Sequence, residues 1–193
     1  MRNFLVAILF LGLLSLPLMA QDYPRAEVFG GYQYLHTGDI TVDGSTTQSS
    51  QGHNGWDASL RGNFNRHFGL EGDFGGTYAT VSGVHWHTYT FTGGPVLFFD
   101  AGGKVKPFVH VLFGGFHTSL SASSGGTTGS ISKTGFTTMF GGGIDAKVNK
   151  AISVRIIEAD WLYYHLGDLQ PLTSSSISQS NNVRITTGIV FTF

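Results

Sequence analysis

The sequence contains no cysteine and little charge, since Lys, Arg, Asp and Glu together make up 12% of its 193 residues. Without cysteine there is no disulfide, no thiolate nucleophile and no thiolate metal site. A formal net charge of −1 provides no basic surface for a nucleic acid, so we expect no nucleic-acid partner. Soluble domains average about 25% charged residues. Much of this protein's surface must therefore face something other than water.

Long apolar runs are missing too, except at the N-terminus. There Arg2 precedes an apolar run over residues 4–16, and Leu18-Met19-Ala20 ends in a small residue. This order predicts a secretory signal peptide over residues 1–20 that is cleaved after Ala20. The alternative, an N-terminal transmembrane anchor, needs about 20 apolar residues. We therefore expect an exported chain whose folded domain spans residues 21–193.

The remaining sequence shows apolar and polar residues alternating with period two, which indicates β-strands. At the C-terminus, for example, Ile185, Ile189 and Phe193 share one face and Arg184 lies on the other. The pattern recurs in segments long enough to cross a bilayer as tilted strands. Eight strands are predicted, at about residues 25–37, 53–65, 68–82, 85–99, 106–118, 134–148, 151–165 and 182–193.

The connections between these strands differ in length. Long segments rich in Ser, Thr, Gly and Gln span residues 38–52, 119–133 and 166–181, whereas the other connections are short. Short turns at one end and long loops at the other are typical of outer-membrane barrels, with periplasmic turns and extracellular loops. The sequence predicts an all-β fold, an eight-stranded antiparallel up-and-down transmembrane β-barrel, located in the cell outer membrane among phospholipid and lipopolysaccharide.

If the apolar face of each strand points to lipid, most charged side chains point into the barrel. The opposite orientation is unfavourable, because Arg or Lys facing lipid at the midplane costs about 2–4 kcal/mol. An eight-stranded lumen is just wide enough for side chains to fill. We therefore favour a sealed, salt-bridged interior, with a narrow gated ion path as the alternative. The predicted polar network of the lumen comprises Glu27, Asp57, Arg61, Glu71, Asp73, His110, Asp145, Lys147, Glu158, Asp160 and Arg184.

The predicted strand over residues 151–165 does not alternate regularly. Arg155 and Glu158 are an odd number of residues apart, which places them on opposite faces of a regular strand. A bulge near Ile156 and Ile157 would bring Arg155, Glu158 and Asp160 inward together. Alternatively, Arg155 lies at the periplasmic end and extends to the membrane interface.

Aromatic residues are expected in two girdles, Tyr and Trp toward the loops and Phe near the turns. His85 and His87 share one strand face, but spacing ties no third ligand to them. A nucleophile elbow is also absent from the sequence. We therefore predict no catalytic, cofactor-binding or metal site, and we do not expect an enzyme.

Two stretches, residues 26–32 (AEVFGGY) and residues 141–149 (GGGIDAKVN), resemble the OmpA-like transmembrane barrel of the outer membrane protein β-barrel domain group. The end of the chain, with Ile189, Phe191 and Phe193 at alternate positions, resembles the signal read by the barrel-assembly machinery. The resemblance implies a structural or surface-interaction, adhesin-like role, with loops 38–52, 119–133 and 166–181 binding an extracellular ligand. A narrow pore for ions or small solutes is the alternative, and an outer-membrane lipid-modifying enzyme is a minor one.

Overall fold

The computed structural model describes residues 24–38, 40–42, 45–48, 51–81, 84–99, 103–124, 127–165, 177–179 and 182–193. The predicted signal peptide lies outside these residues, so cleavage after Ala20 stays a prediction. Within the described part of the chain, no helix is long and apolar enough to span a membrane.

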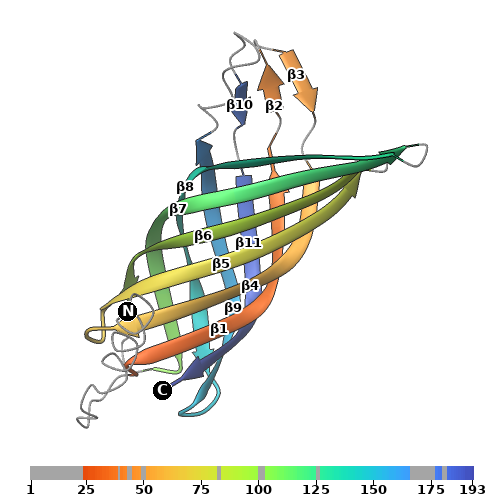
Figure 1. Cartoon of the computed structure of the whole chain (residues 1–193). Coiled ribbons are helices and arrows are strands. Elements are labelled where there is room, and N and C mark those ends of the chain that lie inside the picture. The colour runs from red at the N-terminus through yellow and green to blue at the C-terminus, as the bar shows by residue number, and fades with distance from the viewer. Residues whose placement is uncertain are drawn as a thin grey trace, which may run out of the picture.

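Eight long strands form a closed barrel in which every neighbouring pair is antiparallel (Figure 1). They are β1 (Ala26–Thr37), β4 (Gln51–Asn63), β5 (Phe68–Val81), β6 (Val84–Phe98), β7 (Val105–Ser124), β8 (Thr127–Lys147), β9 (Ile152–His165) and β11 (Asn182–Thr192). Each strand pairs with the next one along the chain, and β11 closes the barrel by pairing with β1. The predicted fold class is confirmed.

Three short strands lie beyond the loop end of this barrel. β2 (Ile40–Val42), β3 (Ser45–Gln48) and β10 (Ile177–Gln179) form a separate sheet in the order β10-β2-β3 (Figure 1). Two segments that the sequence analysis assigned to separate loops, 38–52 and 166–181, are therefore joined by backbone pairing between β10 and β2.

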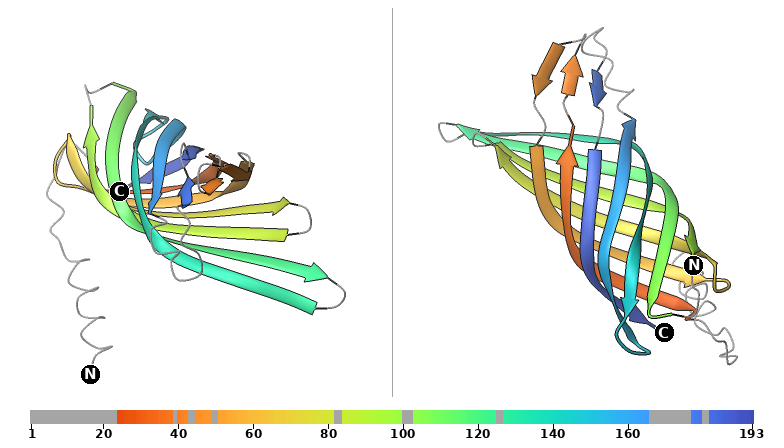
Figure 2. Two further views of the ribbon diagram at one scale, coloured as in Figure 1. Left: turned by 90° about the horizontal axis from the view of Figure 1, so that it is seen from above. Right: turned by 180° about the vertical axis from the view of Figure 1, so that it is seen from behind.

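The predicted loop over residues 119–133 is wrong, because β7 and β8 continue as a hairpin through most of it. The two strands have 20 and 21 residues, and they stay in register from Val105↔Ala146 to Ser124↔Thr127. Mutual pairing satisfies the backbone N–H and C=O groups, so the Ser- and Thr-rich composition that suggested a loop is compatible with a strand. This hairpin and the β5–β6 hairpin project past the rest of the barrel (Figure 2).

The bulge predicted in the seventh barrel strand is confirmed. Opposite β11, the pairs Thr186↔Glu158 and Gly188↔Arg155 leave Ile156 and Ile157 facing Thr187 alone. Opposite β8, the register shifts at the same point. Ile156 and Ile157 are therefore both exposed on the outer face, 56% and 43%, while Arg155 and Glu158 point inward and are 1% and 0% exposed.

The outer face of the barrel is apolar, as a lipid-facing wall requires. In β4, for example, Trp56 and Leu60 are exposed whereas Asp57, Ser59 and Arg61 are buried. The aromatic side chains on this face include the two expected groups, but exposed Phe residues also lie elsewhere on the wall, namely Phe74, Phe91, Phe113, Phe136 and Phe140. Toward the loops are Tyr32, Tyr34, Trp56, Tyr78, Trp161 and Tyr163, and near the turns are Phe64, Phe68, Phe99 and Phe193.

The bulge can be tested by single-residue deletions in β9. Deleting Ile156 restores regular alternation, because Ile157 then lies alone between Arg155 and Glu158, and we expect a folded barrel. Deleting Ala159 makes Glu158 and Asp160 adjacent, so a regular strand must turn one of them to lipid, and folding should fail. Heat-modifiable gel migration after refolding into lipid vesicles distinguishes the two. Equal folding of both variants would contradict the assignment.

Candidate functional site

The barrel interior holds the densest cluster of polar groups in the described chain. Inward positions of seven of the strands, every one but β6, supply its charged side chains, since successive residues of a strand alternate between lumen and lipid. All of these side chains are at most 5% exposed. The acids are Glu27, Asp57, Glu71, Asp73, Asp145, Glu158 and Asp160, and the bases are Arg61, Lys106, Arg155 and Arg184, with His110 beside them.

Arg184 of β11 is the centre of the part of this network that lies toward the loops. Its guanidinium Nη1 lies 2.6 Å from Asp57 Oδ2 and 3.0 Å from Asp73 Oδ1. Its Nη2 lies 2.7 Å from Asp160 Oδ2 and 3.3 Å from Glu158 Oε1. A single cation thus joins carboxylates of β4, β5 and β9 across the lumen.

Arg61 of β4 and Arg155 of β9 form the next layer of the network, closer to the turns. Arg61 pairs with Glu71 at 3.0 Å and with Asp145 at 3.1 Å. Arg155 donates to Asp145 at 2.9 Å and to Glu158 at 2.7 Å. Asp145 therefore contacts two guanidinium groups and Glu158 contacts three, which holds β4, β8 and β9 together through their side chains.

His110 of β7 bridges two carboxylates. Its Nδ1 lies 2.9 Å from Glu71 Oε2, and its Nε2 lies 2.8 Å from Asp160 Oδ1. A neutral imidazole carries a single N–H, whereas the protonated ring donates from both nitrogens. Two carboxylate partners, in a lumen with more acids than bases, therefore indicate a protonated His110.

This geometry does not fit a metal site. Ligand atoms of Glu71, His110 and Glu158 lie within 4.8 Å of one another. Both His110 nitrogens, however, already contact carboxylates, and both glutamates pair with arginines. A cation would have to displace protons and guanidinium groups that are already in place.

Toward the turns, aromatic rings cover the basic groups. The Lys106 ammonium pairs with Glu27 at 2.6 Å and lies 4.0 Å from the Phe98 ring centroid. The guanidinium of Arg61 lies 3.9 Å from the centroid of Phe108, and that of Arg155 lies 4.1 Å from that of Phe29. Cation–π contacts of this kind stabilise desolvated cations.

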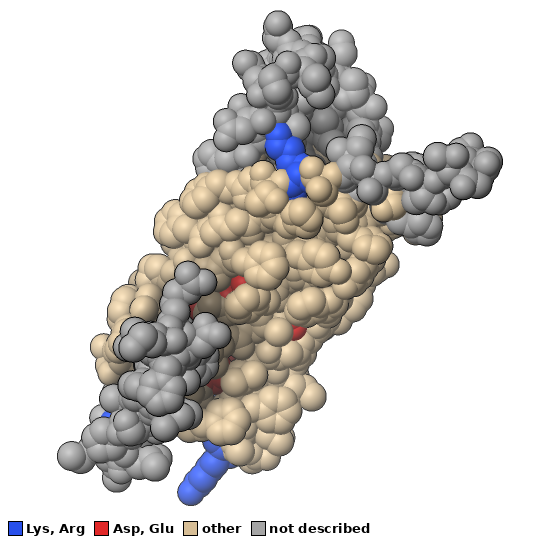
Figure 3. Space-filling view, viewed as in Figure 1, with Lys and Arg blue, Asp and Glu red and all other residues tan. Residues whose placement is uncertain are grey.

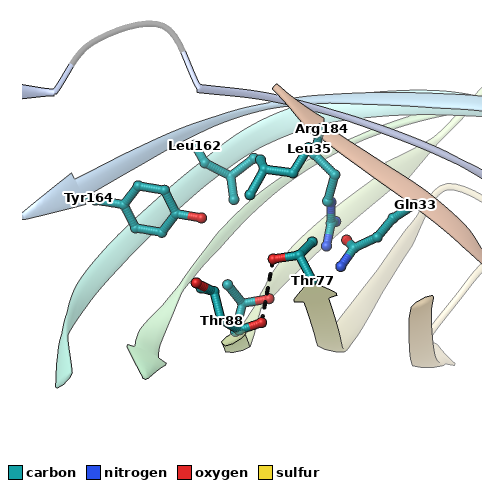
Figure 4. A pocket seen from close by; sticks show the side chains of 8 residues that line it. Gln33, Leu35, Thr77, Thr88, Leu162, Tyr164 and Arg184 are labelled. Atoms are coloured by element: carbon teal, nitrogen blue, oxygen red, sulfur yellow. Dashed lines mark hydrogen bonds between the residues drawn. The ribbon is translucent and has the colours of Figure 1, made fainter. Parts of the chain in front are cut away.

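Toward the loops, an apolar layer covers the network. Its buried members are Leu35, Leu112, Phe116, Met139, Leu162 and Tyr164. A pocket between this layer and Arg184, lined also by Gln33, Thr77 and Thr88, has a volume of about 10 Å³ (Figure 4). This is about the space that one water molecule requires. The interior is thus less uniformly polar than the sequence pattern predicted.

Glycines on the inner face make room for the network. A Cβ on Gly141 of β8 would overlap Asp160 Oδ1, which accepts from His110. A Cβ on Gly31 of β1 would lie 2.6 Å from the Phe29 ring that covers Arg155. Glycine within a strand otherwise weakens pairing. It is required at these positions because neighbouring atoms occupy the space of a side chain.

Most of the predicted lumen residues lie together in the interior. Lys147 differs, since it is only half-buried near the turn end of β8. Lys106 was not predicted, although it shares the period-two phase of His110 in the same strand. The predicted assembly signal, Ile189, Phe191 and Phe193, lies exposed on the outer face, and its role stays a prediction.

Replacing Arg184 with Met should destabilise the barrel strongly. The change keeps side-chain length but leaves Asp57, Asp73 and Asp160 without their shared cation, and breaking a buried ion pair in this way costs about 3–5 kcal/mol. Urea titration of the barrel in lipid vesicles measures the loss. Lys133→Met, outside the lumen, is the control and should change stability by less than about 0.5 kcal/mol. Similar losses in both variants would refute a central role for Arg184.

Gly141→Ala should also destabilise the barrel, by about 1–3 kcal/mol, because the added methyl displaces Asp160 from His110. Gly30→Ala is the matched control, since a Cβ there meets nothing within 4 Å. We expect the control to change stability by less than about 1 kcal/mol in the same titration. A Gly141→Ala protein as stable as wild type would show that the lumen accommodates a methyl group at this position, which would contradict the close contact with Asp160.

Solved structures with a similar fold are outer-membrane barrels. Ail of Yersinia pestis has a TM-score of 0.57 at 20% identity, over 87% of this chain and 98% of its own. Neisserial surface protein A has a TM-score of 0.64 at 12% identity, over 90% of this chain and 100% of its own. The N-terminal β-barrel domain of Pseudomonas aeruginosa OprF has a TM-score of 0.53 at 12% identity, over 89% and 100%. These identities support the fold alone.

No curated protein has a matching sequence. The family model described as the outer membrane protein beta-barrel domain matches residues 6–191, nearly the whole chain. The chain therefore belongs to the outer membrane protein β-barrel domain family, and it is an eight-stranded barrel of the outer membrane.

Proposed function

We propose that this barrel has a structural and surface-interaction, adhesin-like role and that its lumen does not conduct. The observation that carries the proposal is the filled interior. Between the Lys106–Glu27 pair at the turn end and the apolar layer at the loop end, interlocked side chains occupy the lumen. With the lumen closed, the loop end is the part of the molecule available to external partners.

The loop end offers an extended backbone surface for such partners. Among the described residues, the pairing of β8 with β9 reaches Phe136↔His165, whereas its pairing with β7 continues to Thr127. The hairpin therefore extends beyond the described residues of β9, and its loop-end part is rich in Ser, Thr and Gly. These residues favour recognition by hydrogen bonds rather than by charge.

The ligand is expected to be uncharged or a protein surface. One of the similar structures is Ail in complex with a heparin analogue, sucrose octasulfate. Recognition of a sulfated ligand requires cations. The one Lys or Arg in segments 38–52, 119–133 and 166–181 is Lys133, whereas the acids there are Asp39, Asp43 and Asp168. A neutral glycan or a protein fits this composition better than a sulfated polysaccharide.

The alternatives are supported less well. A narrow pore requires both the ion-pair layers and the apolar layer to move aside. A lipid-modifying enzyme requires a nucleophile, a base in contact with it and a third group that orients the base. His117 Nδ1 does lie 2.8 Å from the Thr134 hydroxyl, but the acids in the described part of the chain are all buried in the lumen and do not orient this outward-facing imidazole. His87 lies against the Tyr78 ring. We therefore propose no enzymatic activity.

The proposal includes the route to the membrane. Residues 1–20 act as a cleaved signal peptide, and the barrel-assembly machinery reads Ile189, Phe191 and Phe193. Lipopolysaccharide then surrounds the loop-end half of the wall. The alternating, outward-facing C-terminal strand supports the second step.

Planar bilayer recordings test the closed lumen. The refolded barrel should give no reproducible conductance steps at neutral or acidic pH, with folding verified by heat-modifiable migration. Discrete steps that change on replacing Arg61 or Glu158 would instead establish a narrow pore.

Trimming the β7–β8 hairpin tests the surface role. Replacing residues 119–132 with Asn-Gly joins Thr118 to Lys133, which are paired in the hairpin, through a two-residue turn. Binding to immobilised neutral glycans, matrix proteins and heparin is then compared. We expect a neutral glycan or matrix protein to be bound, with affinity falling about ten-fold or more on trimming. Replacing Gly125-Gly126 alone by Asn-Gly preserves hairpin length and should preserve binding. Equal binding by the trimmed protein would exclude this hairpin as the site.

A further inference from the structure

Charge is sorted between the inside of the barrel and its two ends. Every acidic side chain in the described part of the chain is buried in the lumen. Six basic side chains in that part are instead exposed or half-buried. One of them, Lys133, lies toward the loops. The other five, here named the basic rim, are Arg25, Arg66, Lys104, Lys147 and Lys150.

The basic rim encircles the turn end. Arg66 lies in the β4–β5 turn, Lys150 in the β8–β9 turn, and Arg25 immediately before β1. Lys104 precedes β7, and its carbonyl accepts from the Lys147 amide at 2.7 Å. The backbone around Arg66 is joined to the next turn, since Phe98 N donates to His67 O at 2.8 Å. The five cations are therefore distributed around one ring of turns.

A collar of exposed apolar side chains adjoins these cations. Phe64 is 60% exposed near Arg66, and Val148 is 66% exposed between Lys147 and Lys150. Phe99 and Phe193 belong to the same collar and are 58% and 74% exposed. On the face drawn in Figure 3, the wall is largely tan and a blue side chain projects at the lower end, where the turns lie.

This arrangement places the cations at the depth of lipid headgroups. Exposed Phe and Val side chains belong in hydrocarbon, so cations one or two residues away reach the adjoining interface. The rim also keeps a positive excess when the sequence outside the described residues is counted. In the sequence, the acids nearest to the five rim cations are Asp22 and Asp100, so the cations outnumber the acids. The loop segments contain three acids, Asp39, Asp43 and Asp168, and one cation, Lys133.

We propose that the basic rim binds the phosphate groups of anionic phospholipids in the leaflet at the turn end. The occupant is a lipid rather than an acidic protein because the cations alternate with side chains that only hydrocarbon accommodates. Each cation near an anionic membrane surface is expected to favour association roughly five-fold, and the preference weakens as salt screens the charges.

The test measures which lipids remain bound. The full-length barrel is equilibrated in mixed micelles with equal amounts of phosphatidylglycerol and phosphatidylcholine, repurified, and analysed by lipid mass spectrometry. Wild type should retain phosphatidylglycerol in several-fold excess. The triple variant Arg66→Gln/Lys104→Gln/Lys150→Gln should lose most of this excess, with a ratio close to one, whereas Lys133→Gln at the loop end should retain the several-fold excess.

Folding is verified in the same micelles by heat-modifiable migration. If the triple variant does not fold, the single changes Lys104→Gln and Lys150→Gln replace it, and each should remove part of the phosphatidylglycerol excess. Addition of 0.5 M NaCl to wild type should also lower it. An equal ratio in wild type and the folded variants, or no preference in wild type, overturns the proposal and leaves an acidic periplasmic protein as the partner to seek.

Discussion

A charged side chain that faces hydrocarbon costs several kcal/mol, and this constraint organises the whole barrel. The described acids are all inside, where Arg61, Arg155, Arg184 and Lys106 meet them at ion-pair distances. Burial of these ions is tolerable because each has at least one ion-pair partner and most have several. The apolar outer wall and the ionic interior are thus two consequences of one alternating pattern.

The network also couples strands that are far apart along the chain. Arg184 reaches Asp57, 127 residues away, and Arg61 reaches Asp145, 84 residues away. These contacts form only when the barrel has closed, so they stabilise the closed barrel in addition to the β1–β11 backbone pairing. An interior stabilised in this way has little freedom to open a path for solutes. This is the physical ground for favouring a surface role over a pore.

Period-two alternation was sufficient to predict the eight barrel strands, the inward face of most lumen charges, although not of Lys106, and the bulge at Ile156 and Ile157. It could not predict partners across the lumen, because pairing there depends on strand tilt and side-chain length rather than on sequence spacing. It also missed the apolar layer around Leu112 and Met139, since aliphatic residues on an inner face resemble an irregular lipid-facing run. The hairpin over residues 119–133 was missed because Ser and Thr suggest loops whether or not their backbone groups are paired.

The charge at the turn end follows from the same constraint. Because the lumen takes up the acids of the described strands, the charges that remain in the described turns are positive. The loop segments have no such excess, and they contain mostly uncharged polar residues. The two ends of the barrel therefore present different chemistry, cations beside an apolar collar at one and hydrogen-bonding groups at the other. This asymmetry suits a barrel whose wall spans the membrane, with cations at the lipid headgroups of one leaflet and hydrogen-bonding groups available to partners at the other end.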